Sequence, residues 1–124
     1  METNLNLFVL EGLRAPTLNT ESFEGVGRAA ARLSCVDERF ATVAASVGVE
    51  HGTLEAGERE RLLVEVDALV ARAWGLTPVD LEVVFDDFTL DAVPQAHRER
   101  LRLRLDELTV GGESPTAAPV GNRP

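Results

Sequence analysis

One segment of this chain combines a long amphipathic pattern with a clear stop. From about Glu58 to Trp74, apolar residues recur three and four positions apart, which is helical spacing. The stripe consists of Leu62, Val66, Leu69 and Ala73, with Leu63, Val70 and Trp74 beside it. Gly75 follows, at a position where glycine adopts the left-handed conformation that ends helices. The pattern predicts a long helix with one buried face, and it places Trp74 in the core.

A second, shorter helix is expected to start directly after this stop. Thr77 suits the N-cap position, Pro78 the first helical position and Asp80 the third, where an acid completes a capping box. The inner face of this helix is predicted to hold Leu81, Val84, Phe85 and Phe88. Two helices joined by so short a turn favour a helical domain.

The remaining segments complete a mainly α fold. Residues 4–10 alternate and then run apolar, which is typical of a short strand. Further helices are expected over about Thr20–Val36, over Glu38–Val47 and from Pro94 to about Leu108. The apolar faces of the first two are predicted to hold Phe23, Val26, Ala30 and Leu33, and Phe40, Val43, Ala44 and Val47. We expect one domain over residues 1–109, a small bundle of about five helices with one short N-terminal strand, and a disordered C-terminal tail over 110–124.

Charge limits what such a domain can bind. The chain has 124 residues, of which 44 % are hydrophobic, and its formal net charge is −9. Because proteins that grip DNA alone usually present a basic face, any contact with nucleic acid is expected to be local or made through a partner. The one basic concentration is on the last predicted helix: Arg98, Arg100, Arg102 and Arg104. A solvated helix face fits this pattern, and so do phosphate contacts by Arg98, Arg102 and Arg104 in a larger assembly.

The titratable residues form no recognisable catalytic or metal-binding pattern. Neither His51 nor His97 has a second His or Cys at helical or hairpin distance, so no metal site is expected. Asp86 and Asp87 are adjacent, and adjacent helix residues point about 100° apart, so they are expected to form a solvated face or a cap instead of an acid–base pair. We therefore predict no catalytic, cofactor-binding or metal-binding residue.

The sequence also indicates a compartment. Cys35 is the single cysteine, so it cannot form an internal disulfide, and its apolar surroundings favour a buried, inert thiol. The N-terminus lacks the basic and apolar regions of a signal peptide, and no stretch is apolar for long enough to span a bilayer. A cytoplasmic protein without membrane contact is expected.

The stretch Glu58–Phe88 resembles the C-terminal segment of large adenine-specific DNA methyltransferases, of the type IIG restriction–modification and BREX kinds. That segment has an Arg-led helix, a Glu-x-Asp-Ala step, an aromatic-Gly-Leu turn and a short helix ending in Phe. The matching residues here are Arg61, Glu65, Asp67, Ala68, Trp74, Gly75, Leu76 and Phe88. Trp74 stands where the family more often has Tyr. The segments Asn4–Phe8 and Leu13–Pro16 are similar to the family's strand and Leu-Pro-x-Pro turn, with Arg14 replacing the first Pro, so the resemblance covers roughly residues 4–90.

The resemblance implies the family's tail without its activity. Family members methylate adenine with an Asn-Pro-Pro-Tyr/Phe motif and a glycine-bearing cofactor loop, whereas this chain has no Asn-Pro step and no tyrosine. The expected function is thus a non-catalytic accessory segment of a DNA-modification system, without a cofactor. Its expected partner is a methyltransferase catalytic subunit, and DNA is reached only through that assembly. The alternative is a small acidic helical protein that binds or regulates other proteins and is unrelated to DNA modification.

Overall fold

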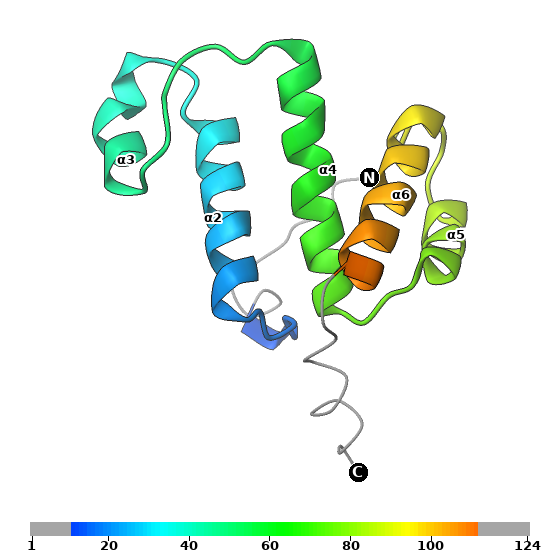
Figure 1. The fold of residues 1–124 in the computed structure, drawn as a ribbon. Helices are drawn as coiled ribbons and strands as arrows, with labels where there is room; N and C mark the ends of the chain where they lie inside the picture. The colour runs from blue at the N-terminus through cyan, green and yellow to red at the C-terminus, as the bar shows by residue number, and fades with distance from the viewer. Residues whose placement is uncertain (1–10, 112–124) are drawn as a thin grey trace.

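A computed structural model describes residues 11–111, and this part of the chain is mainly α-helical, as predicted (Figure 1). Its elements are α2 (Thr20–Ser34), the 3-10 helix η1 (Glu38–Phe40), α3 (Ala41–Ser46), α4 (Ala56–Ala73), α5 (Pro78–Asp86) and α6 (Gln95–Gly111). Between residues 11 and 111 there is no strand. The strand predicted over residues 4–10 lies outside the described residues, as does the predicted tail from residue 112 onwards. Helix α6 continues to Gly111, past its predicted end near Leu108.

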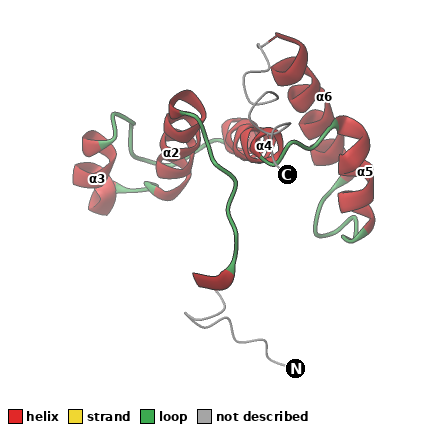
Figure 2. Ribbon diagram, turned by 90° about the horizontal axis from the view of Figure 1, so that it is seen from below, coloured by secondary structure: helices red, strands yellow, loops and turns green. Residues whose placement is uncertain are grey.

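The helices lie side by side in the order α3, α2, α4, α6, α5. Figures 1 and 2 show this row from two directions, and the packing pairs agree: α2 packs on α3 and α4, α4 packs on α6, and α6 packs on α5. Helix α4, near the middle of the row, therefore contacts a helix on each of two sides. The backbone of α5 approaches α6 but not α4.

Helix α2 begins where a side chain caps it. Asn19 Oδ1 accepts a hydrogen bond of 2.7 Å from the Ser22 amide. Ser22 and Ala29 are buried against α4, whereas Phe23 is 67 % exposed. The prediction that Phe23 belongs to the buried face is therefore wrong. The buried face of α2 consists of small residues, which allow α2 and α4 to approach closely; a Cβ at Gly25 would lie 3.1 Å from Leu69 Cδ1.

The predicted helix over residues 38–47 is divided. Asp37 caps its start, as a bond of 2.9 Å from the Arg39 amide shows, but the first turn is the 3-10 helix η1 and α3 follows. In α3 only Ala44 is buried, while Val43 and Val47 are exposed, so the predicted apolar face is only partly buried. So short a helix at the end of the row has too few neighbours to cover its valines. Cys35, in the preceding turn, is buried as predicted.

The helix restart after α4 was predicted correctly. Gly75 has a positive φ of 75° and ends α4. Thr77 then caps α5, since Thr77 Oγ1 accepts from the Asp80 amide at 3.2 Å and Asp80 Oδ2 accepts from the Thr77 amide at 2.8 Å. This reciprocal capping box fixes where α5 starts. The apolar face of α5 packs against α6.

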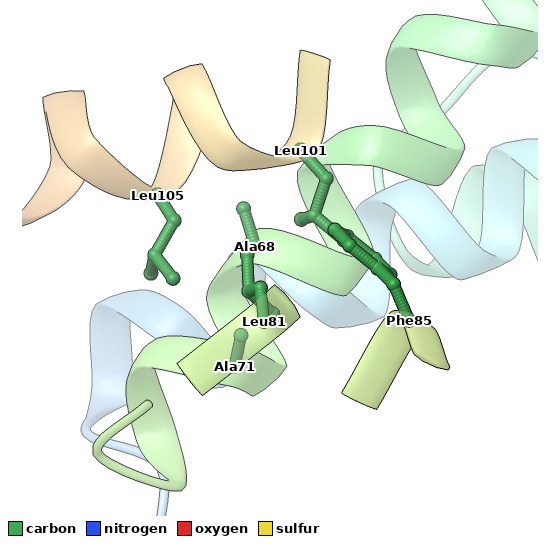
Figure 3. Packing of buried hydrophobic residues seen from close by; sticks show 6 residues of the cluster. All are labelled: Ala68, Ala71, Leu81, Phe85, Leu101 and Leu105. Carbon is green, nitrogen blue, oxygen red and sulfur yellow. The ribbon is translucent and has the colours of Figure 1, made fainter. Parts of the chain in front are cut away.

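The main core lies where α4, α5 and α6 meet (Figure 3). It consists of Ala68 and Ala71 from α4, Leu81 and Phe85 from α5, and Leu101 and Leu105 from α6. Because the two alanines have short side chains, the larger side chains of α5 and α6 pack directly over α4 at this point. Burial of these apolar side chains is the main force that holds the three helices together.

Candidate functional site

A groove of about 800 Å³ runs between α4 and α5, with α6 beside it. Its lining is mostly apolar and includes Leu63 and Val70 of α4, Val84 of α5, Val93 of the connecting loop and Leu101 of α6. The groove exists because α5 packs on α6 and keeps its backbone away from α4. The side chains of Leu81 and Phe85 bridge the gap, through the core described above. The volume lies within the range typical of binding sites, about 300–1,000 Å³.

Large apolar side chains in the groove remain exposed. Trp74 is 52 % exposed and Phe88 is 50 % exposed, and both line the groove. The prediction that Trp74 belongs to the core is therefore wrong, and Phe88 is only half-buried where the sequence predicts an inner-face residue. Trp74 and Phe88 both follow the helical apolar pattern, but α5 packs on α6 and leaves this side of α4 uncovered. Exposed aromatic groups gathered in one groove are typical of binding surfaces.

A histidine bridges two helices at the polar side of the groove. His97 of α6 hydrogen-bonds to two carboxylates of α4, Nδ1 to Glu60 Oε1 at 2.7 Å and Nε2 to Asp67 Oδ2 at 2.8 Å. Arg100 adds a longer ion pair of 3.7 Å to the same Glu60 oxygen. These four charged residues all line the groove, and they largely neutralise one another.

The bridge changes the protonation of His97. Partial burial lowers the pKa of its imidazole, but the hydrogen bonds to Glu60 and Asp67 act in the opposite direction and outweigh burial, so the pKa is raised above its ordinary value. With both nitrogens facing carboxylate oxygens, the doubly protonated ring suits the site, since each nitrogen then donates. When doubly protonated, His97 donates to one carboxylate through each ring nitrogen and links α4 to α6.

Arg98, a candidate phosphate contact, is directed to the backbone of its own chain. Its Nε donates to Val93 O at 2.7 Å, and its Nη2 donates to Phe88 O at 2.9 Å and to Thr89 O at 3.2 Å. Its guanidinium also lies 5.2 Å from the centre of the Phe85 ring. Arg98 therefore holds the α5–α6 connection in place, and most of its donors are already used.

The other two candidates are held by acidic side chains. Arg102 pairs with Glu82 of α5. Arg104 makes a two-pronged contact with Glu65 of α4, at 2.7 and 3.0 Å, and a further bond of 3.1 Å to Glu107. The hydrogen bonds with Glu65 raise the pKa of the Arg104 guanidinium. The structure thus places Arg98, Arg102 and Arg104 on one helix, as predicted, and gives each an internal partner that sequence spacing could not indicate.

The other residues considered as metal ligands or catalytic groups are not brought together in a site. Among residues 11–111, no group of three or more His, Cys, Asp and Glu side chains is arranged to hold a metal ion. In the bridge of Glu60, Asp67 and His97, both ring nitrogens are already bonded to the carboxylates. Asp86 and Asp87 are exposed at the end of α5, and His51 is exposed in the loop before α4. No helix within the same range is both long and apolar enough to cross a bilayer.

Comparison of the chain with models of protein families, with curated proteins and with solved structures found no match. The fold and the groove alone therefore define the kind of protein: a small helical domain with a partly open apolar groove along one of its helices.

Two features of the groove, the bridge by His97 and the exposure of Trp74, could not be predicted from the sequence. The bridge by His97 joins residues 30 and 37 positions apart in the sequence, so no local spacing could reveal it. The exposure of Trp74 depends on where α5 docks, which the helical pattern does not specify. One signal was present: the patch of apolar residues from Leu62 to Trp74 is wider than a single neighbouring helix can cover.

Proposed function

We propose that this chain is a protein-binding domain, and that its groove takes up a helical segment of a partner protein. The observation that carries the proposal is the half-exposure of Trp74 and Phe88 within one apolar groove. A helix laid in the groove would cover both rings and complete a bundle around α4, which is a common mode of peptide recognition. The charged groups along the groove pair with one another, which supports a role in binding over a role in catalysis.

The length of the groove supports a helix as its occupant. Along α4 the lining runs from Glu60 to Trp74. At 1.5 Å per residue this wall is roughly 20 Å long, about four helical turns. An amphipathic helix of that length presents anchors at three- and four-residue spacing, which suits a groove with apolar side chains on both walls.

Selection from a library of displayed helical peptides against the purified chain tests the proposal. Trp74 is the only tryptophan and lies in the groove, so its fluorescence reports occupancy directly. Enriched peptides should shift Trp74 emission to shorter wavelength and should lose affinity at least about tenfold for Val84→Asp. Val83→Asp is the matched control, because Val83 is 69 % exposed on the same helix and outside the groove. Failure to enrich any peptide, or equal binding to both variants, would contradict the proposal.

A second candidate function is favoured by the resemblance to adenine-specific DNA methyltransferases. The resembling stretch Glu58–Phe88 makes up nearly all of α4 and α5, which are the two long walls of the groove. In this version the chain is a non-catalytic accessory segment of a restriction–modification system in the cytoplasm, in keeping with its single, buried Cys35. The occupant of the groove is then the methyltransferase catalytic subunit, which also supplies the basic surface for DNA.

This second candidate has its own test. The isolated chain, at a net charge of −9, should bind neither duplex DNA nor S-adenosylmethionine, whereas a complex with a catalytic subunit should shift DNA in a gel. Replacing Arg98, Arg102 and Arg104 by Ala in that complex should reduce the salt dependence of DNA binding if these side chains leave their internal partners for phosphates. An unchanged salt dependence would assign the arginines to the fold alone, and tight DNA binding by the isolated chain would refute the partner-dependent scheme.

A further inference from the structure

We infer that the helix bound in the groove is basic: apolar anchors seat it on Trp74 and Phe88, and its arginine or lysine side chains face the acidic end of α5. This inference rests on the function proposed above and adds the chemistry of the partner. Charge complementarity is the feature that supports it.

The charged residues of α5 and of the loop that follows it are all acidic. From Leu76 to Pro94 the chain contains five acidic residues and no basic one. Two of these acids are already engaged, Asp80 in the capping box and Glu82 with Arg102. Within the described part of the chain, the other acids take part in no ion pair: Asp86, Asp87 and Asp91.

Asp87 and Asp91 are the chain neighbours of two residues that line the groove. Phe88 and Ala92 line it, and Asp87 and Asp91 directly precede them in the chain. All of these acidic side chains belong to exposed residues, so they are accessible to a partner. A helix lying against Phe88 would therefore bring its flanking residues close to two carboxylates.

The acids at this end of α5 also oppose the helix dipole. The C-terminus of a helix carries partial negative charge, and carboxylates there are unfavourable. Asp86 ends α5 and Asp87 follows, with no basic residue in the last turn. Arg98 offsets part of this charge through its bonds to Phe88 O and Thr89 O. One guanidinium against three carboxylates leaves a local net charge of −2, which cationic groups of a partner would relieve.

The opposite wall has no comparable excess. Its acids, Glu60 and Asp67, are bonded to His97, and Glu60 also pairs with Arg100. The unpaired negative charge beside the groove therefore lies on the α5 side. This asymmetry gives the bound helix a preferred face, with its apolar stripe on α4 and α5 and its cations toward Asp87 and Asp91.

Two synthetic helices of about 16 residues test the inference with the full chain. They share one apolar face of Leu and Ile and differ only in their flanking residues, which are Lys and Arg in one and Glu in the other. Trp74 emission measures the dissociation constant of each at low and high salt. The basic helix should bind at least about tenfold tighter at low salt, and the difference should shrink in about 0.5 M salt because exposed charges are screened.

Two variants locate the effect. Asp87→Asn combined with Asp91→Asn should remove most of the preference for the basic helix. Asp106→Asn is the control, because Asp106 is an exposed acid of α6 outside the groove. Equal binding of the two helices, tighter binding of the acidic one, or a preference that survives the Asp87/Asp91 change would refute the inference while leaving the groove a helix-binding site. Absence of binding by both helices would refute the inference and the proposed function together.

Discussion

The exposure of Trp74 can be tested by comparing the energetic cost of removing it with that of removing a true core residue. A tryptophan in a core buries up to about 250 Å². With 52 % of its surface exposed, Trp74 keeps roughly 120 Å² from water, which at about 25 cal/mol per Å² gives an upper limit of about 3 kcal/mol for Trp74→Ala. Because the side chain borders an open groove, its removal leaves no closed cavity to add to this cost.

Leu105 provides the comparison. It is fully buried among α4, α5 and α6, so Leu105→Ala should cost about 3–5 kcal/mol through lost burial and a closed cavity. Leu103 is 65 % exposed on the same helix, and Leu103→Ala should change the free energy of unfolding by no more than about 0.5 kcal/mol.

Urea unfolding followed by far-ultraviolet circular dichroism measures all three variants, because this signal does not depend on the tryptophan. The expected order of destabilisation is Leu105→Ala, then Trp74→Ala, then Leu103→Ala. A Trp74→Ala variant as unstable as Leu105→Ala would mean that the ring is buried in solution. The groove would then be closed, and the reasoning that makes it a binding site would fail.

Three further changes have defined outcomes. His97→Gln should destabilise the protein most below about pH 6, and the difference from wild type should vanish as pH rises through the raised pKa of His97. The reason is that the protonated bridge contributes stability only while the folded-state ring stays charged. Urea unfolding across the pH range measures this difference. Gly27→Ala should raise the melting temperature by the equivalent of about 1 kcal/mol, since its Cβ meets nothing within 4 Å, whereas Gly25→Ala should gain less because its Cβ presses on Leu69 at 3.1 Å. Thr77→Ala should cost about 1 kcal/mol in the same assay by removing the capping box of α5, and an unchanged melting temperature would show that the box is dispensable.

Local sequence signals predicted the helices well. The stop at Gly75 and the capping box of Thr77 and Asp80 depend on residues close together in the chain, and both were predicted correctly. The burial of Cys35 was also predicted. The division of residues 38–47 into η1 and α3 was missed, because the helical spacing of apolar residues does not distinguish a 3-10 turn from the start of an α-helix.

The candidate site depends on long-range packing, which the sequence alone does not reveal. Trp74 and Phe88 follow the same helical pattern as Leu81 and Phe85, yet only the latter pair is buried. The difference arises from the side on which α5 meets α6. The arginines of α6 were located correctly in sequence, but the Glu65 partner of Arg104 lies 39 residues away in the chain, beyond any spacing rule.

The central position of α4 has a consequence for how the protein opens. On one side α4 carries Leu69 and Arg72 against α2, and on the other it carries Ala68 and Ala71 in the core shared with α5 and α6. Loss of α2 and α3 therefore uncovers one side of α4 while the core on the other side stays intact. Amide hydrogens of α2 and α3 can exchange with solvent through this partial opening, whereas those in the middle of α4 exchange only when the whole domain unfolds. Occupation of the groove would slow exchange in α5 first, since the backbone of that helix approaches α6 but not α4.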